Sequence, residues 1–126
     1  MVTNTRVFGH RLSGVEIAGG AHATFTNNII GACSITGRGV ASGVLVKAGV
    51  SDFIIQGNHI SDVFEGNHIG DVFDGQNSSN TKFGVEIEAG PTDRYVVSAN
   101  TLIGNAVGGL KDGDSGLWKS VAGNVH

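Results

Sequence analysis

The feature that most constrains this chain is an internal repeat. Three segments, 13–17, 42–46 and 83–87, place a glycine before alternating apolar residues. Each segment is followed, after a short turn, by a β-rich run that contains asparagine and a later apolar residue. These runs are 25–30, 55–60 and 97–102. A unit this short cannot bury its apolar face alone, so the units must stack, and the repeat predicts a solenoid.

Asparagine recurs at a similar place in each unit. Its positions are Asn4, Asn28, Asn58, Asn100 and Asn124, at intervals of 24, 30, 42 and 24 residues. Asparagine tolerates the left-handed backbone of a tight bend, and its amide can bond the equivalent asparagine one unit away. We therefore expect a ladder of five stacked asparagines. The alternative is chance recurrence of Asn-rich turns, and the matching flanks argue against it.

Period-two alternation assigns the faces of three short strands in each unit. The positions expected to face the core are Val15, Ile17, Phe25, Ile30, Val44, Val46, Ile55, Ile60, Val85, Ile87, Val97 and Leu102. Glu16, Leu45 and Glu86 share an outward position on the first strand. Stacking the units at about 4.8 Å per coil would bury the inward residues.

Composition supports strands and excludes two other classes. Glycine makes up 21 of the 126 residues, whereas proline and cysteine occur once each. Frequent valine, isoleucine and threonine disfavour a helical bundle, and the lack of an every-third-residue glycine pattern excludes a collagen triple helix. The glycines are expected at turns. The lone Cys33 cannot form an intrachain disulfide and is expected to be a small buried apolar residue.

The longest asparagine interval has a visible cause. Residues 57–65 are nearly repeated by 66–74, with seven of nine positions identical. We interpret this as a tandem duplication inside one coil and expect a loop insertion around 57–82. The acidic side chains and histidine of this loop have no recognised metal-ligand spacing, so we expect a solvated loop.

Charge and hydropathy exclude several partners. The formal net charge is −3 and no basic stretch stands out, so nucleic acid is not expected to bind. No apolar run approaches the roughly 20 residues that a membrane span needs. The first six residues lack the apolar core of a signal peptide. We therefore expect no membrane span and no signal peptide in this chain.

One four-residue run carries a family resemblance. Residues 57–60 read Gly-Asn-His-Ile, which matches the G-N-x-I pattern that closes the bend between the second and third sheets of pectate-lyase-like proteins. The chain resembles this family over about residues 4–124, and its repeats are most similar to bacteriophage tailspike and receptor-binding proteins. The resemblance implies an all-β, single-stranded right-handed parallel β-helix of about four to five coils. Family enzymes have many more coils, so residues 1–126 are expected to form one β-helix segment of a longer chain.

The same resemblance implies a function. It favours recognition of bacterial surface polysaccharide by a homotrimer, on a virion tail or at another extracellular location, without a cofactor. Two alternatives stay open: a part of a polysaccharide lyase or glycoside hydrolase, and a purely structural trimeric shaft. The motif specifies architecture strongly and activity weakly, so this segment is not assigned an enzymatic activity.

Outward acids are the candidate catalytic residues. Glu16 and Glu86 lie two coils apart, so their backbones should be separated by about 9.6 Å. Inverting glycosidases hold their two carboxyl groups roughly 6.5–9.5 Å apart. Leu45 would lie between the two glutamates, which weakens the pairing. Asp93 is a third candidate, and no metal site is predicted.

Two aromatic residues are candidates for carbohydrate contact. Tyr95 and Trp118 carry the large amphipathic rings of the sequence, and the alternative for each is packing at a core edge or at a subunit contact. Asp112 and Asp114 resemble part of an acidic calcium loop. The twelve-residue calcium pattern with its terminal glutamate is absent, so a plain turn is expected there.

Overall fold

The computed structural model describes residues 1–31, 33–34, 37, 39–60 and 81–126. These residues form strands and turns, with no helix among them, and hence none that could cross a membrane. The strands in chain order are β1 (Val2–Thr3), β2 (Arg6–Phe8), β3 (Val15–Ile17), β4 (Thr24–Thr26), β5 (Ile29–Gly31), β6 (Val44–Val46), β7 (Ser51–Gln56), β8 (His59–Ile60), β9 (Phe83–Gly90), β10 (Asp93–Ser98), β11 (Gly108–Asp114) and β12 (Lys119–Ala122).

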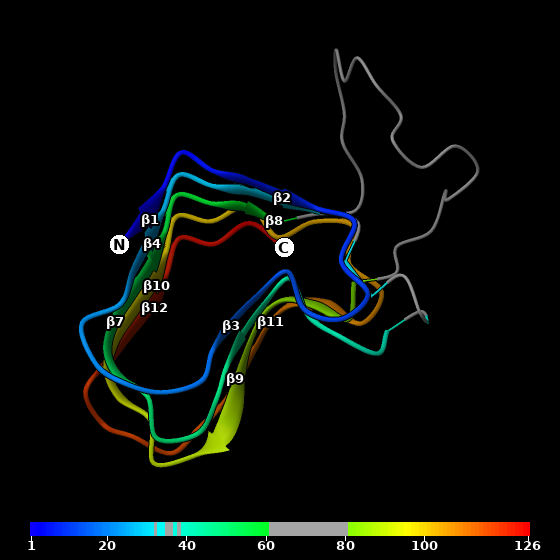
Figure 1. The fold of residues 1–126 in the computed structure, drawn as a ribbon. Coiled ribbons are helices and arrows are strands. Elements are labelled where there is room, and N and C mark those ends of the chain that lie inside the picture. The colour runs from blue at the N-terminus through cyan, green and yellow to red at the C-terminus, as the bar shows by residue number, and fades with distance from the viewer. Residues whose placement is uncertain (32, 35–36, 38, 61–80) are drawn as a thin grey trace.

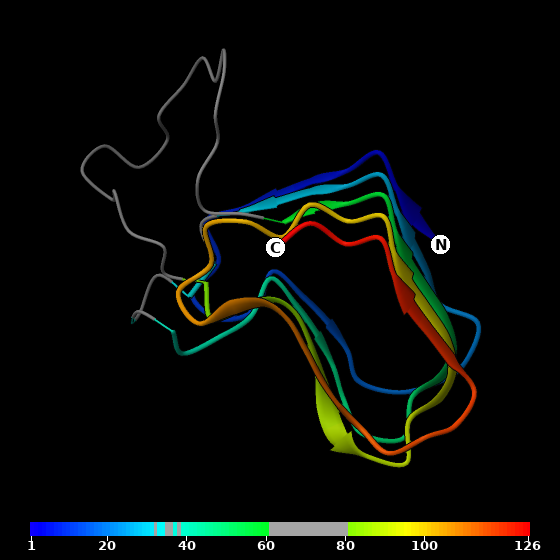
Figure 2. The ribbon, with the colours of Figure 1, turned by 180° about the vertical axis from the view of Figure 1, so that it is seen from behind.

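The strands build three parallel sheets. Sheet A has the order β1-β4-β7-β10-β12, sheet B the order β2-β5-β8, and sheet C the order β11-β9-β6-β3. In the first three coils the chain visits sheets A, B and C in turn, and in the fourth it passes from β10 to β11 through a single bridge of Thr101 to His59 of β8, so each circuit is one coil and the next coil lies beside it (Figure 1). The view from behind shows the same outline repeated by successive coils (Figure 2). The predicted all-β parallel β-helix is therefore confirmed.

Strand register confirms the inward columns predicted from alternation. In sheet C, Val15 pairs with Val44 and Val44 with Val85, and in sheet A, Phe25 pairs with Ile55. Most of these residues are at most 3% exposed: Phe25, Ile30, Val44, Val46, Ile55, Ile60, Val85, Ile87, Val97 and Leu102. In the first coil, Val15 and Ile17 are partly buried and pack against this core. Cys33 also lies in the core.

The asparagine ladder runs through four coils. The Nδ2 group of Asn28 donates to Oδ1 of Asn58 over 3.0 Å, Asn58 donates in the same way to Asn100, and Asn100 to Asn124. The backbone N–H of each donor asparagine is bonded to the same oxygen as its amide. Each Nδ2 also donates to a main-chain carbonyl of the preceding coil. The buried amides therefore have partners on both sides.

Asn4 does not belong to this ladder, so its assignment from spacing was wrong. Thr5 occupies the equivalent position, and its backbone N–H donates to Oδ1 of Asn28 over 2.9 Å. Asn4 instead has a φ of 53° and lies one residue earlier. Positive φ recurs at that preceding position in the other coils, at Asn27, Gly57, Ala99 and Gly123. The left-handed bend therefore precedes the ladder, and the ladder asparagines serve as hydrogen-bonding groups.

A column of glycines lets sheet C approach the core closely. Gly14, Gly43, Gly84 and Gly109 each precede the first inward residue of a sheet C strand. A methyl group on Gly43 would meet Cγ2 of Ile60 and lie 2.9 Å from the carbonyl oxygen of Gly84. Real Cβ atoms rarely come this close to backbone, so the shared glycine is required by packing.

The connection between sheets B and C varies in length from coil to coil. It runs from Gly31 to Val44 in one coil and from Ile60 to Phe83 in the next. The expected insertion around 57–82, with its tandem duplication, lies mostly outside the described residues. On either side of this connection the strands stay in register with the preceding coil: β8 pairs with β5, and β9 pairs with β6.

Candidate functional site

The candidate site is an open hollow on the outer face of sheet A, about 580 Å³ in volume. Strands β7 and β10 and the start of β12 line it. Strand pairing places Ile54 beside Val96 and Val96 beside Ser120, which forms one row of outward side chains across three coils. The residues two positions earlier in the chain form a second row: Asp52 on β7, Arg94 on β10 and Trp118 just before β12. The hollow therefore has an apolar centre with charged and aromatic groups at one side.

Arg94 and Asp52 form an ion pair within the second row. Nε of Arg94 lies 2.6 Å from Oδ1 of Asp52, and an Nη nitrogen lies 2.9 Å from Oδ2, so the contact is bidentate. The hydrogen bonds from Arg94 lower the pKa of Asp52 to about 2. Both residues have positive φ, 54° for Asp52 and 52° for Arg94, which turns both backbones in the same way. The pair is therefore held by two similarly bent strands.

Trp118 carries the exposed aromatic surface of the hollow. Its side chain is 73% exposed, and its backbone N–H donates to Oδ1 of Asp93 over 3.0 Å. Leu117 beside it is 89% exposed, and Ile54 in the first row is 39% exposed. Trp118 thus remains a candidate for carbohydrate contact. Asp93 anchors the backbone of Trp118 in this arrangement.

Tyr95 does not present its ring to the outside, so the structure corrects its candidacy for carbohydrate contact. The residue is 3% exposed and stacks on Phe53 with ring centroids 4.7 Å apart. Its hydroxyl donates to Oδ1 of Asp112 over 2.8 Å and lies 3.3 Å from Oδ2 of Asp114. Burial, together with these carboxylates, raises the pKa of Tyr95 well above its ordinary value. Its alternation with outward Arg94 and Val96 directs the ring into the coil.

The acidic pair near the end of β11 is occupied by protein groups. Nζ of Lys119 lies 2.9 Å from Oδ2 of Asp112 and 3.6 Å from Oδ2 of Asp114, whose side chain is fully buried. The backbone N–H of Thr92 donates to Oδ1 of Asp114 over 3.0 Å. These bonds tie the end of β11 to β10 and β12. The expectation of a plain turn here was wrong, because Asp112 and Asp114 lie in strand β11, where they pair with Ile87 and Gly90. Over the described part of the chain, no group of three or more His, Cys, Asp or Glu side chains is placed to hold a metal ion.

Glu86 points outward as predicted but is 7% exposed. Ser42 donates a hydrogen bond of 2.7 Å to its carboxylate, and Nζ of Lys82 and Nζ of Lys111 each lie 3.0 Å from Oε1. Burial alone would raise the pKa of Glu86, but the hydrogen bonds from Ser42 and the two lysines outweigh it and hold the pKa below its ordinary value. The carboxylate is therefore a buried counter-ion that stays ionised.

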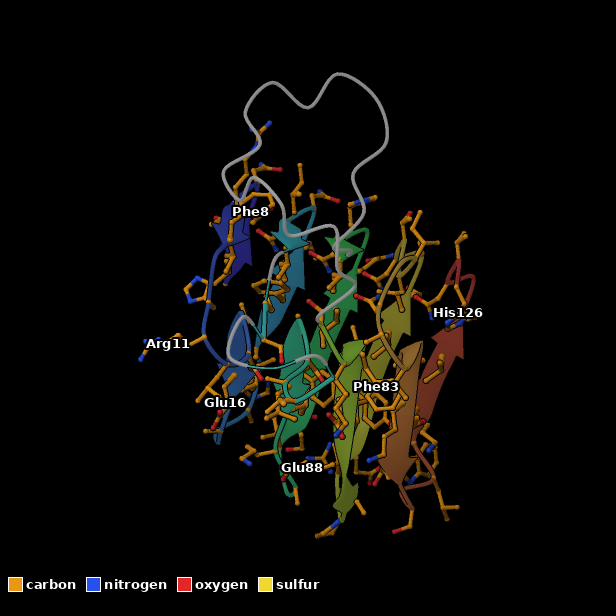
Figure 3. All side chains as sticks on the ribbon, turned by 90° about the vertical axis from the view of Figure 1, so that its right-hand side faces the viewer. Phe8, Arg11, Glu16, Phe83, Glu88 and His126 are labelled. Carbon is orange, nitrogen blue, oxygen red and sulfur yellow. The ribbon has the colours of Figure 1, made fainter. Side chains whose placement is uncertain are left out.

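Glu16 and Glu86 do not form a pair of facing carboxylates. Register places Leu45 between them, next to Glu16 on one side and Glu86 on the other. Figure 3 shows Glu16 in the first coil, apart from Phe83 and Glu88 of β9. Glu88 is bound to Lys47, with 2.7 Å between Nζ and Oε1. Asp93 lies on sheet A, so the three candidate acids occupy separate places and do not share a site.

Sequence reasoning missed Asp52, Arg94, Ile54 and Val96. The signal was present in the alignment of 52–56 with 94–98, where charged, aromatic and apolar residues recur in the same order. That comparison places an acid beside a base and an outward isoleucine beside an outward valine.

Comparison of the chain with family models, with curated proteins and with solved structures finds no match.

Proposed function

We propose that this β-helix is an adhesin-type segment, similar to those of phage tailspikes, that binds bacterial surface polysaccharide in the hollow of sheet A. The observation that carries the proposal is the exposed indole of Trp118, in a row with Arg94 and Asp52 and beside Ile54 and Val96. Binding sites for small ligands combine apolar and aromatic walls with a few fixed polar groups. The hollow has this composition.

The chemistry of sugars matches these groups. A sugar ring has an apolar C–H face that can pack on an indole, and hydroxyls at its edge that need both donors and acceptors. Trp118 supplies the flat apolar surface, Arg94 supplies donors and Asp52 supplies acceptors. All three lie on or beside paired strands, which fixes their spacing better than a loop would.

The biological setting is part of the proposal. A homotrimer on a virion tail or at another extracellular location is implied by the resemblance to tailspike proteins. A parallel trimer would repeat the hollow three times, and a polysaccharide with many repeats would then bind by avidity. Light scattering on the purified chain measures the oligomeric state directly.

The test is binding of the purified protein to an array of bacterial capsular and lipopolysaccharide glycans. We expect binding that is lost, by at least about tenfold, in Trp118→Ala. The matched control is Leu12→Ala, because Leu12 is also an exposed apolar residue, 63% exposed, and lies near the other end of the stack. Binding that survives Trp118→Ala would contradict the placement of the site. If no glycan on the array binds, the alternative of a purely structural shaft is favoured over the adhesin.

A further inference from the structure

We propose that the hollow of sheet A selects uncharged sugars and rejects acidic ones; this rests on the proposed glycan binding. The reason is that its charged groups are already paired with one another. Asp52, Arg94 and Lys119 are the charged residues that line the hollow. The ligand class follows from what each of them contacts.

Arg94 is occupied by Asp52. Two of its nitrogens contact the two carboxylate oxygens, at 2.6 and 2.9 Å, and the second of these also lies 3.4 Å from the hydroxyl of Ser51. A bidentate arginine–carboxylate contact is the geometry that an acidic sugar would itself need. Asp52 therefore holds the place that the carboxylate of a uronic acid would take.

Lys119 is paired with carboxylates of β11. Its ammonium group contacts Asp112 and Asp114 and donates to the carbonyl oxygen of Asp114 over 3.2 Å. These two carboxylates exceed the single charge of Lys119, so this cluster adds no positive field to the hollow. Asp93, which binds the backbone of Trp118, adds a further negative charge nearby.

An acidic sugar would therefore meet an unfavourable balance. To make the bidentate contact with Nε and Nη2 of Arg94 it would have to displace Asp52, whose carboxylate would then lie unpaired beside the ligand's negative charge; at Nη1 it would still face the carboxylate bound to the same guanidinium. Like charges placed together oppose binding strongly. A neutral sugar meets no such cost, because its hydroxyls can bond to the outer edges of an intact ion pair. Nη1 of Arg94 makes no hydrogen bond within the described residues, so a donor remains for such a hydroxyl.

The experiment compares a neutral polymer, dextran or mannan, with polygalacturonate by calorimetry. We expect the wild-type protein to bind a neutral polymer at least about tenfold more tightly, with little change between low and high salt. Asp52→Asn should free Arg94 and improve affinity for polygalacturonate about fivefold or more. Asparagine accepts the positive φ of this position, so the variant should fold.

Glu88→Gln is the matched control, because Glu88 lies on β9 of sheet C, away from the hollow, and the change removes the same charge and frees Lys47, which follows β6. We expect it to leave both affinities unchanged. An equal gain in both variants, or tighter and salt-sensitive binding of polygalacturonate by the wild type, would overturn the selectivity alone. Absence of binding to all polymers would overturn the proposed function as well. So would a dimer that forms through Trp118, because a second copy would then fill the hollow.

Discussion

The rings of Phe53 and Tyr95 lie parallel on neighbouring coils, with 4.7 Å between their centroids and 3° between their planes. Strand pairing places the two residues directly opposite each other in sheet A. The stack fills the corner of the core between sheets A and C, and the hydroxyl of Tyr95 reaches across to Asp112 on β11. One residue thus serves packing and hydrogen bonding together.

Tyr95→Phe should separate these two roles. The ring stack is kept, but Asp112 and Asp114 lose a donor, so we expect the free energy of unfolding to fall by about 1–2 kcal/mol. Tyr95→Ala also removes the ring and should cost about 3–5 kcal/mol. Urea unfolding measures both. A Tyr95→Phe protein as stable as the wild type would show that the hydroxyl bonds contribute nothing.

Loss of a central ladder amide should be costly. Asn58→Ala leaves the backbone N–H and one of the two amide N–H groups of Asn28 without their acceptor, and the carbonyl of Phe25 without this donor; the other amide N–H of Asn28 keeps its bond to Val2. Each buried polar group left unpaired costs about 1–3 kcal/mol, so we expect a total loss of about 3–5 kcal/mol. The control is Asn4→Gly, which changes an exposed asparagine outside the ladder at a positive φ that glycine also accepts. Equal effects of the two changes on thermal unfolding would contradict the ladder's role.

A methyl group in the glycine column should destabilise the stack. Gly43→Ala forces Ile60 or the backbone of Gly84 to move, and we expect a loss of about 2–3 kcal/mol in the free energy of unfolding. Gly19→Ala is the control, since nothing lies within 4 Å of the added methyl group. Its effect should stay within about 1 kcal/mol. Chemical unfolding of the two variants side by side tests the comparison.

Stability should depend on the protonation of His59. Burial lowers the pKa of His59 below its ordinary value of 6.5. As the pH falls through 6.5, the unfolded chain takes up a proton at this site before the folded chain does. Stability is therefore lost on acidification, by less than about 1.4 kcal/mol per pH unit. Between pH 7.5 and 5.5, the free energy of unfolding should fall less steeply for His59→Gln than for the wild type. Parallel slopes would be evidence against this assignment.

Alternation and repeat spacing were enough to predict the core. Phe25 and Ile55 face inward because every second residue of a paired strand shares a face, and this depends on the local sequence alone. Four of the five asparagines predicted for the ladder belong to it. Asn4 was misassigned because the first coil has threonine at the ladder position and asparagine at the bend, which spacing alone does not distinguish.

The surroundings of outward residues were not predictable in the same way. Glu86 faces outward, yet Ser42 and Lys111, which are 44 and 25 residues away in sequence, cover and neutralise it. The pairing of Asp52 with Arg94 spans 42 residues and depends on a matching backbone bend in both coils. Side-chain contacts of this kind follow from register between coils, so they emerge only when the coils are stacked.

The ladder also gives the stack a direction. Asn28, Asn58 and Asn100 each donate, from the backbone N–H and from Nδ2, to the side-chain oxygen of the asparagine in the coil that follows in sequence. At the ladder the two faces of a coil are therefore unlike: the side-chain oxygen faces the preceding coil, and the backbone N–H faces the following one. Whatever continues the ladder must do so head to tail, since two like faces would set acceptor against acceptor. Association through these faces would be polar and open-ended, and it would build a filament instead of a closed twofold dimer.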